Sequence, residues 1–79
     1  MERESLLSSI REIITGILED EGVVIEENTA PEDIDGWDSV THIQLVSELE
    51  KQYGIKLTLK EVMSWESIGE LIDVILSKL

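Results

Sequence analysis

The chain has 79 residues, of which 18 are acidic and six are basic, so its formal net charge is −12. It contains no cysteine and one histidine, which excludes a disulfide framework, a cysteine nucleophile and a histidine cluster for zinc. The hydrophobic fraction of 42% is enough for one small core, so residues 1–79 are expected to form a single domain. No apolar run is long enough to span a bilayer and the charged N-terminus is unlike a signal peptide; we therefore expect a cytoplasmic protein without membrane insertion.

The acidity is concentrated in the middle of the chain. The stretch from Glu12 to Glu50 holds acids but no lysine or arginine, and the acids outside it balance all the basic residues. Such a stretch is compatible with a solvated surface or with a field that steers basic partners, and the sequence leaves both interpretations open. Nucleic-acid binding is not expected, because the phosphate backbone would be repelled.

An amphipathic helix of about 15 residues is predicted near the N-terminus. Its apolar stripe consists of Leu6, Leu7, Ile10, Ile13, Ile14, Ile17 and Leu18. Gly16 weakens this helix slightly, and Gly22 is predicted to end it. Residues 22–37 form a long loop, because Pro31 and Gly36 interrupt any periodicity. The loop is expected to attach to the core through Val23, Val24, Ile25, Ile34 and Trp37.

A second helix is predicted from about Ser39 to Gln52, with Asp38 as its N-cap and Gly54 at its end. Its apolar stripe consists of Val40, Ile43, Leu45, Val46, Leu49 and Tyr53.

Two further helices are predicted from capping motifs. Thr58 and Glu61 have the spacing of a capping box that opens a short helix through Met63, and Ser67 and Glu70 repeat that spacing at the start of the last helix. The last helix has the apolar stripe Ile68, Leu71, Ile72, Ile75 and Leu79. The fold class is therefore all-α: a small four-helix bundle with three long helices, one short third helix and a long loop between the first two.

The segment Gly36-Trp37-Asp38-Ser39-Val40 lies where the loop meets the second helix. An Asp-Ser pair before an apolar stripe is by itself most often only an N-cap. Here it is followed by Leu45-Val46, Leu49-Glu50, Tyr53 and Gly54-Ile55, and over nearly its whole length the chain resembles the acyl carrier protein family. Length, helix count, loop position and acidity agree with that resemblance.

The resemblance implies that Ser39 is the attachment point of 4′-phosphopantetheine, a covalent cofactor taken from coenzyme A. Asp38 would cap the helix and support recognition by the transferase. The arm ends in a thiol that carries cargo as a thioester, so the protein is expected to be a carrier and not an enzyme, with no catalytic residue and no metal. The implied partners are a phosphopantetheinyl transferase, an acyl- or aminoacyl-loading enzyme, and synthases or transferases with basic surfaces; a monomer is expected.

The resemblance also implies a partner surface on the second helix, the end of the loop and the third helix. It comprises Asp35, Val40, Ile43, Gln44, Glu48, Glu61, Val62 and Met63, with Asp38 beside them. Core packing is the alternative for Val40, Ile43 and Val62, and simple solvation is the alternative for Glu48 and Glu61. An acyl chain could be sheltered by Val46, Leu49, Leu57, Val62, Ile68 and Leu71, whereas a polar or aminoacyl group would stay outside.

Several positions differ from the pattern usual in fatty-acid synthesis. Val40 replaces a leucine, and Thr41, Gln44 and Ser47 make the face after Ser39 less charged. This favours a carrier of a specialised pathway, such as polyketide or nonribosomal peptide synthesis, over a housekeeping carrier. Trp37 and His42 resemble those of discrete carriers in specialised pathways, aminoacyl and peptidyl ones included. Trp37 would either anchor the loop or touch the arm, and His42 is expected on the solvated surface.

Three other functions fit the sequence less well. A calcium loop with Gly36 at its sixth position would put Pro31 first and His42 twelfth, which does not fit an EF-hand. An acidic interaction domain without a prosthetic group is allowed by the charge but leaves the Asp-Ser motif unexplained. A hydrolase would need His42 as a base for Ser39, with no sign of an oxyanion hole.

Overall fold

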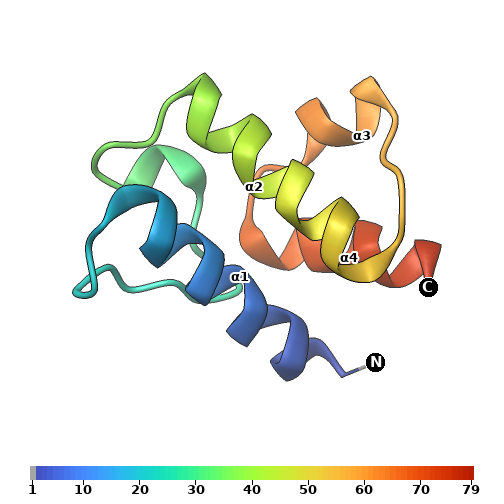
Figure 1. The fold of residues 1–79 in the computed structure, drawn as a ribbon, viewed down its shortest axis with the longest axis horizontal. Helices are drawn as coiled ribbons and strands as arrows, with labels where there is room; N and C mark the ends of the chain where they lie inside the picture. The colour runs from blue at the N-terminus through green and yellow to red at the C-terminus, as the bar shows by residue number, and fades with distance from the viewer. Residues whose placement is uncertain (1) are drawn as a thin grey trace.

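The computed structural model describes residues 2–79 and shows four α-helices (Figure 1). Their bounds are α1, Arg3–Leu18; α2, Ser39–Tyr53; α3, Leu59–Ser64; and α4, Ile68–Lys78. One short 3₁₀ helix, η1, covers Pro31–Asp33 in the long connection between α1 and α2. The all-α prediction is therefore confirmed, with three long helices and a short third one.

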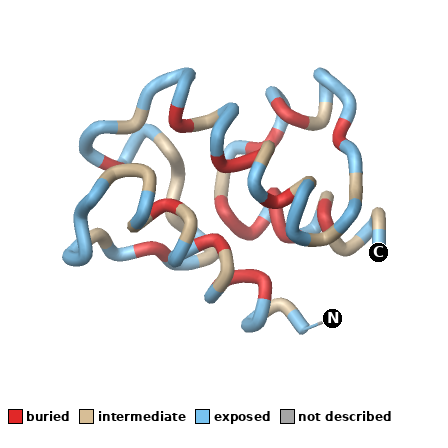
Figure 2. The backbone as a smooth tube through the Cα atoms, viewed as in Figure 1, coloured by how far each residue is buried: buried red, intermediate tan, exposed pale blue. Residues whose placement is uncertain are grey.

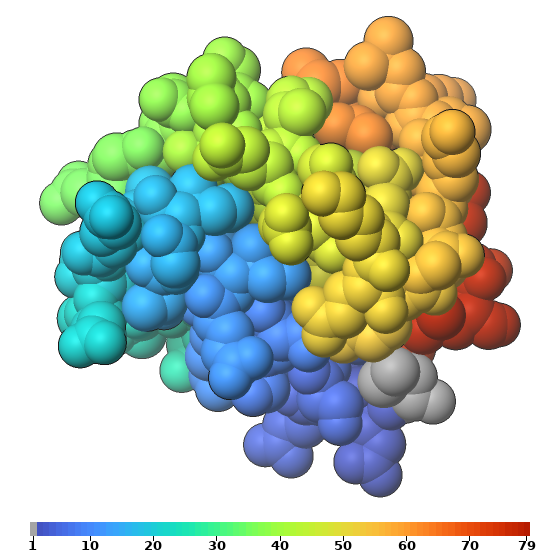
Figure 3. Space-filling view, viewed as in Figure 1, coloured from blue at the N-terminus to red at the C-terminus, as the bar shows by residue number. Residues whose placement is uncertain are grey.

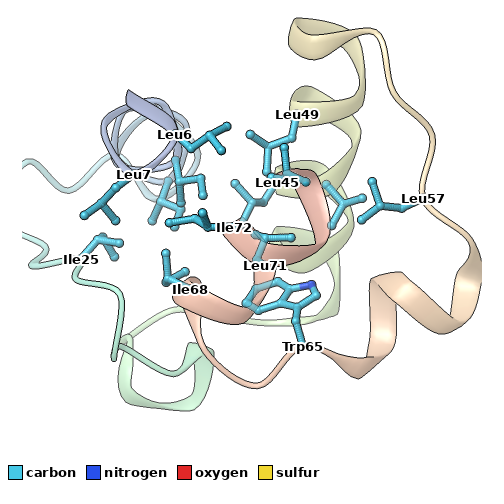
Figure 4. Packing of buried hydrophobic residues seen from close by; sticks show 14 of the residues in the cluster. Leu6, Leu7, Ile25, Leu45, Leu49, Leu57, Trp65, Ile68, Leu71 and Ile72 are labelled. Atoms are coloured by element: carbon cyan, nitrogen blue, oxygen red, sulfur yellow. The ribbon is translucent and has the colours of Figure 1, made fainter. Parts of the chain in front are cut away.

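The core lies where α1, α2 and α4 face one another. Sixteen hydrophobic residues form one buried cluster. In Figure 2 the buried segments, in red, lie mainly on α1, α2 and α4. Figure 4 shows Leu6 of α1, Leu49 of α2 and Ile72 of α4 pointing into a common centre. The six residues considered above as a shelter for an acyl chain all belong to this cluster: Val46, Leu49, Leu57, Val62, Ile68 and Leu71.

The buried face of α2 is rotated from the predicted one. Thr41 is buried together with Leu45, Val46 and Leu49, while Val40 and Ile43 are exposed. A threonine can be buried here because its hydroxyl donates to the Asp38 carboxylate at 3.0 Å and is not left without a partner. The stripe prediction was therefore wrong at its N-terminal end, where it counted apolar residues and missed this polar one.

Three other predictions made from the apolar pattern were wrong: the end of α1 at Gly22, and the packing of Val24 and of Leu79 against the core. α1 ends at Leu18, before Gly22, because Glu19 adopts the left-handed conformation (φ 54°) and its N–H donates to the Thr15 carbonyl. The chain then turns back early enough for Ile25 to enter the core. Val24 points away from the core, as expected of a neighbour of the buried Ile25, and Leu79 follows the last helical residue and is half exposed.

The long connection is attached to the first turn of α4 by its backbone. The N–H of Ile68 donates to the Thr29 carbonyl at 2.9 Å, and the N–H of Gly69 donates to the Glu27 carbonyl at 2.7 Å. These two donors belong to the first turn of the helix, where no intrahelical acceptor exists. A Cβ at position 69 would lie 3.1 Å from that Glu27 carbonyl oxygen, so the close approach favours glycine.

The two arginines of the chain, both on α1, hold the same connection. The Arg3 guanidinium donates to the Glu27 carboxylate, with its shortest contact at 2.6 Å, and also contacts Asp73 and the Gly69 carbonyl. Arg11 donates to the Ile25 carbonyl at 2.8 Å and pairs with Glu26 at 3.2 Å. The connection is thereby fixed against both α1 and α4.

Local capping motifs set the starts of the last two helices as predicted. The Thr58 hydroxyl accepts from the Glu61 N–H while the Glu61 carboxylate accepts from the Thr58 N–H, which completes a capping box. Ser67 accepts from the Glu70 N–H at the start of α4. At the end of α2, Gly54 adopts the left-handed conformation (φ 64°).

Two glycines offer a matched test of backbone effects. An added Cβ would meet open space at both Gly16 and Gly54, but Gly16 is in the middle of α1 and Gly54 has a positive φ. We expect Gly16→Ala to stabilise the protein by about 0.5–1 kcal/mol through helix propensity. Gly54→Ala should destabilise it by about 1 kcal/mol because alanine is strained in the left-handed conformation. Urea unfolding at equilibrium measures both, and equal effects would contradict this account.

The ion pair between Arg3 and Glu27 should make stability depend on pH. The hydrogen bonds from Arg3 lower the pKa of Glu27, so its contribution is present above the ordinary glutamate pKa of about 4.3 and is lost as pH falls through the lower pKa of the folded protein. Wild type should therefore be more stable than Glu27→Gln at neutral pH, and the difference should shrink in acid. Equilibrium unfolding of wild type and Glu27→Gln at neutral and at acidic pH measures this difference in stability. Glu21→Gln, in the exposed loop, is the control.

Candidate functional site

The start of α2 is fixed by Asp38. Its carboxylate accepts from the Thr41 N–H at 2.8 Å and from the Thr41 hydroxyl at 3.0 Å. These bonds, the one from the backbone first, lower the pKa of Asp38, so the side chain is an anion at neutral pH. The predicted N-cap is confirmed, and it holds the backbone on which the next residue is presented.

Ser39 is the first residue of α2, and its side chain is exposed. The position places its hydroxyl at the positive end of the helix dipole, where an attached anion is favoured. Figure 3 shows that the first part of α2, in green, meets the orange surface of α3 along one edge of the molecule. Ser39 and Met63 of α3 line the same hollow.

A hollow of about 650 Å³ opens directly beside Ser39. Residues from η1, the start of α2, the end of α3 and the link to α4 surround it, and its surface is mainly apolar. The lining residues are Pro31, Glu32, Trp37, Asp38, Ser39, His42, Ile43, Met63, Trp65 and Glu66. We call this hollow the aromatic pocket.

Three rings form the aromatic wall of this pocket. His42 stacks on Trp65 with ring centres 4.6 Å apart, and Trp37 stands edge-on to both at 6.0 and 6.3 Å. Trp65 is almost fully buried beneath Leu71 in Figure 4, and its indole N–H has no acceptor among residues 2–79. Trp37 is half-buried against the core and also lines the pocket, so both of its predicted roles are compatible with its position.

His42 is not the solvated surface residue that the sequence suggested. Its ring is half-buried, and Nε2 lies 2.7 Å from the Val62 carbonyl oxygen. A carbonyl only accepts, so Nε2 carries the proton and donates it to that carbonyl. This bond ties α2 to α3. Among residues 2–79 no hydrogen bond joins this ring to Ser39, so the hydrolase alternative loses its main support.

The comparisons with known proteins agree with this geometry. Residues 8–75 match the family model described as the phosphopantetheine attachment site. The holo acyl carrier protein of Geobacter metallireducens, solved by NMR in solution, is similar at 33% identity over 91% of this chain and 83% of its own, with a TM-score of 0.80. The chain belongs to the acyl carrier protein family.

A second solved structure shows the same fold. The crystal structure of the acyl carrier protein of Thermotoga maritima has 24% identity and a TM-score of 0.86, and the match covers 99% of this chain and 91% of that one. A search of curated proteins found no match.

Family membership establishes the cofactor and the type of activity. Members carry 4′-phosphopantetheine covalently and are carriers, not enzymes, that interact with phosphopantetheinyl transferases and acyl-handling enzymes. The residues of this chain fit the group: Ser39 is exposed and lies at a helix N-terminus beside a pocket of sufficient size and mixed polarity. Within residues 2–79 no helix is long and apolar enough to cross a membrane, and no three potential ligand side chains are grouped to hold a metal.

Most residues predicted for the partner surface are exposed. Val40, Ile43 and Met63 are large apolar side chains exposed at 61%, 52% and 66%. Core packing is thereby excluded for the first two. Asp35, Gln44 and Glu48 add exposed polar groups on the loop and on α2.

Two predicted partner residues have internal contacts. Val62 is buried in the core. Glu61 pairs with Lys78 at 2.6 Å and accepts from the Thr58 N–H, and these contacts, Lys78 first, lower its pKa. A partner that approached Glu61 would have to compete with Lys78, so this carboxylate also links α3 to the end of α4.

Sequence reasoning missed three of the ten residues that line the aromatic pocket. Trp65, Glu66 and Glu32 were not singled out, although they line the pocket together with Trp37 and His42. They belong to segments far apart in the sequence, and no local pattern relates them. The one available signal was a large aromatic residue, Trp65, in a short link between two capped helices.

Proposed function

We propose that the protein carries acyl-type intermediates as thioesters on a 4′-phosphopantetheine arm attached to Ser39, and presents them to the enzymes of a specialised biosynthetic pathway. The observation that carries this proposal is the exposed Ser39 hydroxyl at the start of α2, next to a capping Asp38. No other serine of the chain follows an aspartate in this way.

Attachment is a phosphoryl-type transfer to the Ser39 oxygen. That oxygen attacks the β-phosphate of coenzyme A, a new P–O bond forms, and the pyrophosphate bond breaks to release 3′,5′-ADP. The hydroxyl proton passes to a base of the transferase, since Thr41 engages the Asp38 carboxylate and no hydrogen bond joins His42 to Ser39 among residues 2–79. The product is a phosphodiester that the first free N–H groups of α2 favour. When bound, the arm supplies the thiol that a cysteine-free chain lacks.

The proposed partner surface is the exposed patch of Val40, Ile43 and Met63 with Glu48 and Asp35 around it. Apolar side chains bordered by carboxylates suit an enzyme that has a basic rim around an apolar contact. Gln44 lies within this face. Glu61 is a secondary contact for which a partner would compete with Lys78. Val62 is buried in the core beneath this surface and offers little exposed area.

The modification site is tested by intact mass. We expect a gain of one phosphopantetheine when the protein is incubated with coenzyme A, magnesium and a promiscuous phosphopantetheinyl transferase. Ser39→Ala should gain nothing, because the accepting oxygen is absent. Ser47→Ala, also on α2, is the matched control and should be modified normally.

Variants of Asp38 separate capping from recognition by the transferase. Asp38→Asn keeps a capping acceptor and loses the charge, whereas Asp38→Ala loses both. Modification of Asp38→Ala should be slower than that of wild type, while circular dichroism should show that the fold is retained.

Normal loading of Ser39→Ala would refute the attachment site. A folded wild type that an active transferase leaves unmodified would favour the acidic interaction domain.

The partner surface is tested by charge reversal. Glu48→Lys should raise the KM of the transferase for this carrier by about three- to tenfold at low salt and reduce the dependence of kcat/KM on salt. Glu21→Lys, in the exposed loop, makes the same change in charge away from the proposed face and should have little effect. If the two variants behave alike, only net charge matters and the partner face lies elsewhere.

A further inference from the structure

The aromatic pocket has a charge pattern that selects among possible cargoes. Glu32 on η1 and Glu66 in the link to α4 line it together with Asp38, and its lining contains no lysine or arginine. Neither Glu32 nor Glu66 takes part in an ion pair among residues 2–79. The pocket therefore presents uncompensated negative charge beside an apolar wall. A carboxylate would be repelled there, and a cation would be attracted.

The wall itself suits a cation. Trp37 stands at 87° to the stacked pair of His42 and Trp65, so it forms a corner with that pair. Cations bind most favourably against tryptophan rings, and recognition sites for organic ammonium groups combine such rings from several directions. The corner is rigid, because the Val62 carbonyl holds His42 and the core holds Trp65.

We propose that the aromatic pocket seats acyl groups that end in a positively charged amine, such as aminoacyl groups, while they are carried on the arm of Ser39. The inference rests on the proposed function, since only a tethered group would be kept next to the pocket. Tethering gives a high effective concentration, so a weak contact is enough to populate the seated state. The phosphodiester at Ser39 would add another negative charge at the edge of the pocket and would strengthen the preference.

The test uses three cargoes that share a three-carbon acyl stem and differ in the charge of the terminal group. Amide-linked coenzyme A analogues bearing 3-aminopropanoyl, butanoyl and succinyl groups are attached to Ser39 by the transferase, and intact mass confirms each product. The ¹H–¹⁵N signals of the Trp37 and Trp65 indoles are then compared with those of the protein carrying the unacylated arm. The shift for 3-aminopropanoyl should be at least about twofold larger than for butanoyl, since only the former can make a cation–π contact. Succinyl should give the smallest shift.

Charge variants at the rim provide the second arm of the test. Glu32→Gln with Glu66→Gln should reduce the 3-aminopropanoyl shift and leave the butanoyl shift unchanged. Glu19→Gln with Glu21→Gln, in the connection but outside the pocket lining, is the control and should keep the full shift. All four side chains are exposed, so the variants are expected to fold, and circular dichroism checks this.

The outcomes separate this proposal from the function on which it rests. Equal shifts for all three cargoes would overturn it and would show that the pocket contacts an acyl group whatever its terminal charge. Loading confirmed by mass without any indole shift would also overturn it and leave the carrier function intact. Failure to gain mass at Ser39 would refute the proposed function, and this inference with it.

Discussion

The long α1–α2 connection is attached to the first turn of α4, and the position of Ser39 depends on this attachment. Two α4 N–H groups, at Ile68 and Gly69, donate to loop carbonyls, and Arg3 closes the junction by binding the Glu27 carboxylate and the Gly69 carbonyl. An acidic connection of this length would otherwise repel itself and sample many conformations. Because it is fixed at its middle, its second half can pack Ile34 and Trp37 and deliver Asp38 and Ser39 to a defined edge of the bundle.

The carboxylates of the chain divide into two groups with different roles. Glu27, Asp38, Glu50 and Glu61 accept hydrogen bonds from backbone or side-chain donors and fix helix ends and loops. Others are directed to solvent, such as Glu48 on α2 and the rim residues of the aromatic pocket. The first group makes a net charge of −12 compatible with a small core, and the second provides the field around Ser39. The role of each carboxylate therefore follows from its hydrogen-bond partners and not from the net charge of the protein.

The chemistry of the site is consistent with a carrier that presents a group and leaves the reactions to other proteins. Ser39 is exposed, Asp38 is engaged in capping, and His42 is engaged with the Val62 carbonyl. What the chain adds is an immediate environment for the arm: apolar side chains on the α2–α3 edge and a rigid aromatic corner with unpaired carboxylates. The proposed partner surface and the proposed cargo pocket therefore share Ile43 and Met63.

The sequence by itself determined the number of helices, the N-caps of the last three and the candidate attachment residue. Asp38, Thr58 and Ser67 each bond a group three residues away, so local spacing was sufficient to predict where α2, α3 and α4 begin. Only the tertiary structure decided which side of α2 is buried, because the burial of Thr41 depends on its bond to Asp38 and on the helices packed against it. It also decided the aromatic pocket, since Trp37, His42 and Trp65 come together only when the connection and α3 pack against α2. Contacts between residues so far apart in the chain depend on the whole fold and leave no periodic trace in the sequence.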